Sequence, residues 1–145
     1  MFREEIPEVK IEGFQVVSRD LFSESQRQAL SCRITKKNIT FTKSSIVALG
    51  NCERIRIEIN VDTRQLLATP VTQSDKDNVR WIKGVKDPSP RTIDCPKFTQ
   101  QLIDKWSWEK EMVYRGYGKL ISVDKKLMIM YDFSKPEKLN KKIRG

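Results

Sequence analysis

The stretch Arg54-Ile55-Arg56-Ile57-Glu58-Ile59-Asn60 places an isoleucine at every second position, between charged or polar residues. Successive side chains of a β-strand point to opposite faces, so this alternation predicts a strand whose three isoleucines face the core. Asp62–Arg64 is typical of a turn, and Gln65–Thr69 reads as a returning strand that ends at Pro70. We therefore expect a β-hairpin over residues 54–70.

A second hairpin is predicted upstream of the first. Arg33–Thr35 and Ile39–Phe41 are rich in β-branched and aromatic residues, and they flank the basic tip Lys36–Asn38. A short helix should follow and end at Gly50-Asn51, because both residues tolerate the left-handed conformation.

The same order of elements is expected again after a polar linker at residues 72–91. A short strand leads to Pro96, which suits a helix start, and a hairpin over residues 112–133 comes next. Gly116 and Gly118 predict a bulge or bend within that hairpin. The helix has one apolar face, formed by Phe98, Leu102 and Trp106.

These two segments match one another, which predicts an internal repeat. Ile39–Lys43 aligns with Ile93–Lys97, and Val61-Asp62 aligns with Val123-Asp124. The alternative is that two such segments occur by chance in an α+β domain. The expected organisation is an N-terminal extension packing on the domain (1–32), unit 1 (33–71), a linker (72–91), unit 2 (92–133) and a basic tail (134–145).

Each unit resembles the swapped-hairpin, AbrB-like superfamily, whose pattern runs from a strand through Pro-Lys into a short helix ending in Leu-Gly, and then a hairpin. The matching residues are Ile39, Phe41, Lys43, Leu49 and Gly50 in unit 1, and Pro96 and Lys97 in unit 2. Thr42 replaces the Pro, and Ile46 and Gln100 replace the usual helix Arg. MraZ-like members of this superfamily carry both units in one chain. The resemblance implies an α+β fold in which two strand–short helix–β-hairpin units form one swapped-hairpin-like barrel, with DNA bound by a basic face.

The charge balance points to the same kind of partner. The 145 residues carry a net charge of +9, distributed as −2 over residues 1–30 and +11 over the remainder. A basic balance of this size attracts polyanions. The predicted nucleic-acid-binding residues are Arg33, Lys36, Lys37, Lys43, Arg54, Arg56, Lys97 and Arg115. The alternative is a solvated strand face without a ligand.

Aromatic residues offer a further route to nucleic acid, because bases of a single strand stack on aromatic faces. The candidates are Trp81, Trp106, Trp108, Tyr114 and Tyr117. Trp106 is expected in the core instead, since it lies in helical phase with Phe98 and Leu102.

Composition excludes several classes of enzyme. The chain has no histidine, so it has no Ser-His-Asp triad, no Cys-His pair and no histidine zinc ligand. Its three cysteines, Cys32, Cys52 and Cys95, are too widely spaced for a metal knuckle or a disulfide framework. Gly116-Tyr117-Gly118 lacks the rest of a dinucleotide fingerprint. We expect a non-enzyme with reduced cysteines and no metal or cofactor.

The sequence therefore predicts a DNA-binding protein that contacts duplex phosphates through a basic strand and turn face, as a transcriptional regulator or a mobile-element accessory protein. The alternative is a non-enzymatic protein-interaction or assembly module with an acidic partner. A homodimer is left open. No stretch has the apolar length of a membrane span, and the start has no apolar core of a secretory signal, so a cytoplasmic location is expected.

Overall fold

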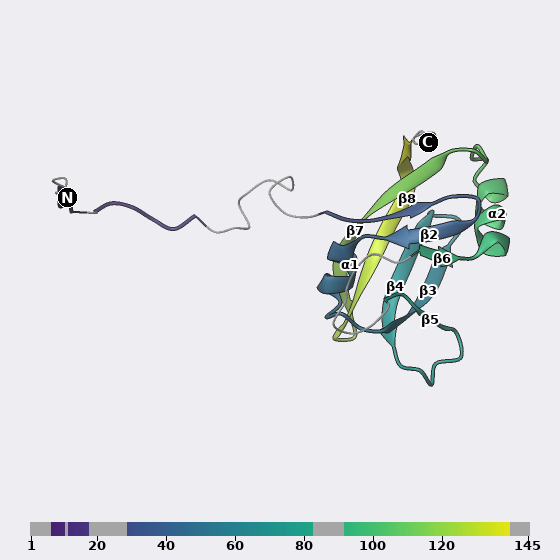
Figure 1. Cartoon of the computed structure of the whole chain (residues 1–145), viewed down its shortest axis with the longest axis horizontal. Helices are drawn as coiled ribbons and strands as arrows, with labels where there is room; N and C mark the ends of the chain where they lie inside the picture. Colours follow the sequence, from purple (N-terminus) through teal and green to yellow (C-terminus); the bar gives the residue numbers. More distant parts are fainter. Residues whose placement is uncertain (1–6, 11, 18–28, 83–91, 140–145) are drawn as a thin grey trace, which may run out of the picture.

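The computed structural model describes residues 7–10, 12–17, 29–82 and 92–139. Of these residues, 48% lie in strands and 14% in helices, and the strands form one curved half-barrel sheet (Figure 1). The strands are β1 (Leu30–Ile34), β2 (Asn38–Phe41), β3 (Arg54–Asn60), β4 (Gln65–Val71), β5 (Asn78–Arg80), β6 (Thr92–Asp94), β7 (Val113–Val123) and β8 (Lys126–Leu139). The helices are α1 (Lys43–Ala48) and α2 (Pro96–Lys105). The strand order is β5-β3-β4-β8-β7-β1-β2-β6, and every pairing is antiparallel.

The expected α+β class, with two strand–short helix–β-hairpin units forming a swapped-hairpin-like barrel, is wrong. The described chain is mostly one eight-stranded antiparallel sheet, and its helices contain only six and ten residues. Two segments that were not expected as strands account for much of the difference. β5 forms within the expected linker, and β8 continues through residues 134–139, which were assigned to the tail.

The connections of the sheet repeat along the chain. The order strand, strand, helix, strand, strand occurs first as β1 to β4 with α1, and then as β5 to β8 with α2. The hairpins β3–β4 and β7–β8 meet through the β4–β8 pair, and β2 pairs with β6. β1 and β2 are paired with one another, whereas their counterparts β5 and β6 form the two edges of the described sheet.

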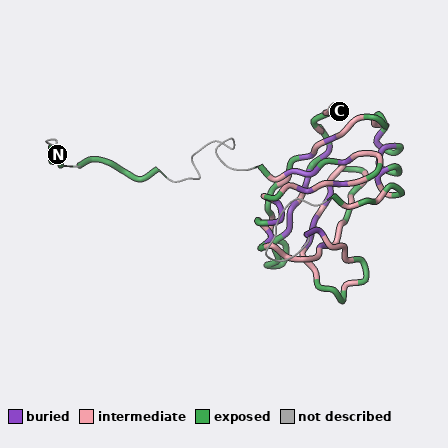
Figure 2. Tube along the Cα trace, in the orientation of Figure 1, coloured by how far each residue is buried: buried purple, intermediate pink, exposed green. Residues whose placement is uncertain are grey.

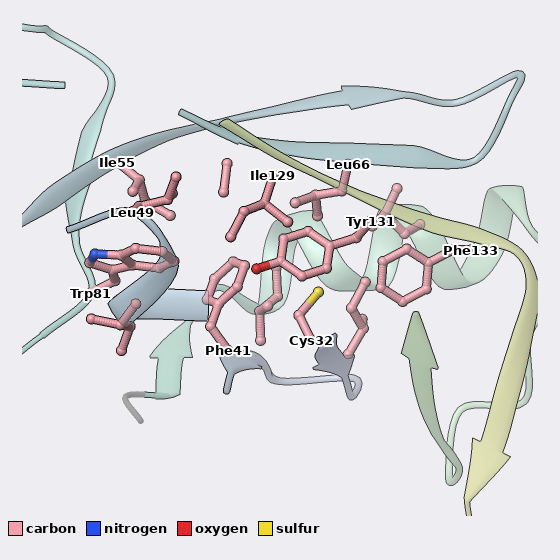
Figure 3. Close-up of a cluster of buried hydrophobic side chains, with 14 of the residues drawn as sticks. Cys32, Phe41, Leu49, Ile55, Leu66, Trp81, Ile129, Tyr131 and Phe133 are labelled. Carbon is pink, nitrogen blue, oxygen red and sulfur yellow. The ribbon is translucent and has the colours of Figure 1, made fainter. Parts of the chain in front are cut away.

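Several aromatic side chains belong to one buried hydrophobic cluster, and Figure 2 shows the buried segments within the body of the sheet and helices. The ring of Phe41 lies 5.3 Å from Trp81 and 5.6 Å from Tyr131, measured between centroids (Figure 3). Trp81 Nε1 donates to the Cys52 carbonyl at 2.7 Å, so its polar atom is satisfied inside the core. Trp81 and Ile82 were expected in a polar linker, but both side chains are fully buried.

The expected irregularity in β7 is confirmed at Gly116. The register of β7 against β8 shifts between Arg115 and Tyr117. A Cβ atom on Gly116 would lie 2.7 Å from the ring of Phe133, and one on Gly118 would lie 2.7 Å from the ring of Tyr131. Glycine is therefore required at both positions because two aromatic rings of β8 pack directly on the β7 backbone.

We predict that Gly118→Ala lowers the free energy of unfolding by about 1 to 3 kcal/mol, because the added methyl group overpacks a site that cannot expand. The methyl group would lie 2.8 Å from Ile129 Cγ2, and Ile129 and Tyr131 are both fully buried. Urea denaturation measures the change. Ser122→Ala, at an exposed position of the same strand, is the matched control, and equal stability of the two variants would refute the packing argument.

Candidate nucleic-acid interface

The eight predicted binding residues fall into three groups in the structure. Arg33, Lys43 and Arg115 line a common groove. Arg54 and Arg56 lie on β3, which is separated from β1 by β4, β8 and β7. The third group lies where the β1–β2 turn meets α2, and it contains Lys36, Lys37 and Lys97. The structure therefore brings together three of the predicted residues, whereas the hairpin interpretation gathered six around one strand face.

The groove combines side chains from β1, α1 and β7, and we call it the cationic groove. Cys32 and Ile34 face the core, so Arg33 between them points outward. Arg115 is its cross-strand neighbour on β7, and both side chains lie on the outer face. The cationic groove has a volume of about 360 Å³, and none of the described residues that line it is acidic.

Lys43 reaches the groove because the start of α1 is held against β1. The Ser31 amide donates to Thr42 Oγ1 at 3.3 Å, and the Thr42 amide donates to the Ser31 carbonyl at 3.1 Å. Thr40 and Thr42 also line the groove, which adds hydroxyl groups next to the three cations. Cations and hydroxyls on a concave surface are suited to bind phosphate oxygens.

Two side chains orient Arg115. Tyr117 lies two residues further along β7, and Glu137 is the cross-strand neighbour on β8. Its Nη1 atom donates to Tyr117 Oη and to Glu137 Oε1, each at 3.2 Å, and Tyr117 Oη donates to the same carboxylate at 2.9 Å. The hydrogen bond with Tyr117 and the charge of Glu137 raise the pKa of Arg115. Arg115 is therefore charged and fixed in place, but Glu137 offsets part of its charge.

The loop that precedes β5 engages Arg56, and the first residue of β5 engages Arg54. Arg56 Nη1 lies 2.8 Å from Asp75 Oδ2, and Arg54 Nη1 donates to Asn78 Oδ1 at 2.7 Å. The amide of Asp77 and the Arg56 guanidinium lower the pKa of Asp75. The charge of Arg56 is therefore matched within the fold, a partnership that could not be read from the polar composition of residues 72–78.

The third group lies at the tip of the β1–β2 hairpin. Lys36 Nζ contacts Glu111 Oε2 at 2.7 Å. Thr99 Oγ1 donates to the Lys36 carbonyl at 2.9 Å, and this bond holds the turn against α2. Lys37 and Lys97 are exposed nearby and add positive charge at this end of the sheet.

A second depression adjoins the cationic groove and shares Tyr117 with it. It has a volume of about 400 Å³, and Lys119 and Lys135 line it together with Asp132. The Ser134 amide donates to Asp132 Oδ1 at 2.8 Å and lowers the pKa of that carboxyl group. The contribution of Lys135 was missed because residue 135 was assigned to the tail. The continuation of β8 places it at this surface.

Among the aromatic candidates, Tyr117 is the one that is exposed, at 47%. Trp81, Trp106 and Tyr114 are buried. Trp108 is half-buried and stacks on Tyr114 at 4.1 Å between ring centroids. The expected core position of Trp106 is confirmed, and the described aromatic residues do not form a continuous stacking platform.

No protein-family model, curated protein or solved structure matches the chain. The resemblance of the short motifs to the AbrB-like superfamily stays a prediction. Neither of the two helices that the structure describes has the length and apolar character needed to cross a membrane.

The three cysteines of the chain lie among the described residues. All three are free, and no group of three metal-ligating side chains occurs within the described ranges. Cys32 is fully buried in the core, and burial raises its pKa well above the ordinary value of a thiol. The thiolate is the nucleophilic form, so Cys32 is held in its unreactive form.

We predict that a thiol reagent at mildly alkaline pH modifies Cys52 and Cys95 in the native protein before Cys32, because Cys32 reacts only when the core opens. In denaturant the chain should show three reactive thiols. The variant Cys32→Ala should lose the slow native phase and keep the faster ones. A fast phase that disappears in Cys32→Ala would contradict the buried position.

Proposed function

We propose that this chain binds duplex DNA in the cytoplasm through the cationic groove, as a regulator or an accessory protein. The observation that carries the proposal is the convergence of Arg33, Lys43 and Arg115 from three separate elements. Cations that converge on one concave surface neutralise phosphates together and release their counterions.

The groove is suited to the DNA backbone rather than to base edges. Its lining includes two arginines with planar guanidinium groups, one lysine with an ammonium group, and the hydroxyl-bearing residues Ser31, Thr40, Thr42 and Tyr117. Guanidinium groups pair with phosphate oxygens through two parallel hydrogen bonds. Phosphate contacts position a protein on the duplex without reading sequence. Lys119 and Lys135 extend the positive surface past Tyr117, so the protein could contact more than one phosphate along the DNA backbone.

We predict that affinity for a random duplex falls steeply with salt, with a slope of log affinity against log salt of about −2.7 to −4.5, since three to five phosphates would be neutralised. The triple change Arg33→Gln, Lys43→Gln and Arg115→Gln should flatten this slope by about three and weaken binding equally on unrelated sequences. Fluorescence anisotropy over a salt series measures both quantities.

The matched control removes the same charge elsewhere, through Lys76→Gln, Lys105→Gln and Lys110→Gln at exposed positions. This control should keep most of the slope. An equal loss in the two triple variants would show that net charge, and not the groove, is responsible. If the wild-type chain does not bind the duplex at low salt, the proposal fails, and a protein-interaction module with an acidic partner becomes the better interpretation.

We further predict that Glu137→Gln strengthens duplex binding by about threefold at low salt, because it removes a carboxylate that competes with phosphate for Arg115. The Gln side chain keeps an oxygen that accepts from Arg115, so the guanidinium keeps its position. The same anisotropy measurement checks the effect. Weaker binding by this variant would mean that the ionic contact is needed to position Arg115.

A further inference from the structure

A second groove, with different chemistry, lies on the other end of α1. It is formed by the last residues of α1, the end of β4 and the start of β8, and has a volume of about 590 Å³. We call it the apolar groove. Its lining includes Val47, Leu49, Pro70 and Leu127, with Lys126 beside them. Val47 and Leu127 are 52% and 49% exposed, so the groove presents apolar surface to solvent.

The same chain carries an apolar segment that the fold does not cover. Phe14 is 80% exposed, Val16 96% and Val17 56%. The described residues between 7 and 17 are exposed and extend away from the sheet (Figure 2). We call the described residues 7–10 and 12–17 the arm. Exposed apolar groups gathered over four consecutive residues are typical of a segment that binds a surface.

We propose that the arm docks into the apolar groove of its own chain, with Phe14 and Val16 entering the groove. The apolar character of both surfaces provides the driving force. Charge favours the same pairing, because Glu8, Lys10 and Glu12 give the arm a net charge of −1, whereas residues 31–145 carry +11. Lys126 in the groove lining is a cation that docking would bring towards Glu8, whereas Glu12 already contacts Lys10 of the arm at 3.8 Å.

The attachment point of the arm makes docking within one chain geometrically accessible. Ser44 Oγ, in the first turn of α1, donates to the Ala29 carbonyl at 2.7 Å. The chain is thereby held beside α1 at Ala29, and Val47 lies three residues beyond Ser44 along this helix, at a rise of about 1.5 Å per residue. The twelve residues after Val17 up to Ala29 can span at most about 40 Å. Covalent attachment within this reach favours the groove of the same chain over that of a second copy.

The test places a photo-crosslinker on the arm of the full chain. Phe14→p-benzoylphenylalanine should crosslink on illumination to residues 47–50, 69–70 or 126–127, as mapped by mass spectrometry. The product should migrate as a monomer, and its yield should not change over an about fiftyfold dilution, because the tether sets the local concentration. The same probe at Gln15, which faces the opposite side of an extended segment, should crosslink to the groove less.

A charged residue in the apolar groove provides the second part of the experiment. Val47→Glu should reduce the crosslink yield by about tenfold, since it adds a carboxylate to an apolar site facing an acidic segment. Leu127→Glu should act alike, and Thr63→Glu, in the exposed turn between β3 and β4, should leave the yield unchanged. Circular dichroism confirms that each variant is folded.

Three results would overturn the proposal. Products of twice the monomer mass would show that a second copy receives the arm. Crosslinks to residues 78–80 or 92–94 would show that the arm adds a strand at a sheet edge. If no crosslink to the apolar groove forms, the arm does not dock there.

Discussion

The contact between Tyr131 and the elements around it is the constraint on which the rest of the structure depends. Tyr131 lies on β8, the strand that pairs with both β4 and β7 and so joins the two long hairpins. Its ring packs on Phe41 and over Gly118, and its hydroxyl donates to Ser45 Oγ at 2.7 Å, across 86 residues of sequence. Burial raises the pKa of Tyr131, so the hydroxyl stays protonated and can donate this bond. One side chain thereby holds α1 against the sheet.

The position of α1 then determines both grooves. Its first residue, Lys43, contributes to the cationic groove, whereas Val47 in its last turn lines the apolar groove. Arg33 and Arg115 come together because β1 pairs with β7, and this long-range pairing depends on the glycines that admit the rings of Phe133 and Tyr131. The surface chemistry is therefore a consequence of packing on the opposite face of the same strands.

Local periodicity was sufficient to predict single elements but not the way they assemble. The alternation of isoleucines predicted β3 with its observed bounds, and Lys36 and Lys37 of the predicted basic tip lie in the turn of the β1–β2 hairpin, whereas Asn38 begins β2. The sheet order depends on contacts between distant residues, which a period of two does not encode. β5 has only three residues and lies in a polar segment, so its composition does not predict a strand. The ion pair between Arg56 of β3 and Asp75, just before β5, is visible only in the folded structure. For the same reason the sequence overestimated the number of cations in the binding cluster, because it included Lys36 and Arg56, which pair with Glu111 and Asp75 in the fold.

If both proposals hold, the two sites would be coupled through electrostatics, because Lys43 of the cationic groove and Val47 of the apolar groove lie on the same six-residue helix. An arm with a net negative charge in the apolar groove would lie within roughly a Debye length of Lys43, about 10 Å at moderate salt. Its field would oppose a phosphate in the cationic groove, and by linkage a bound polyanion would weaken docking of the arm by the same factor. The size of this coupling is limited by solvent screening, because both grooves are open to water. The chain would then respond to a polyanion by exposing the apolar groove, so α1 would connect the two surfaces without any change in its own structure.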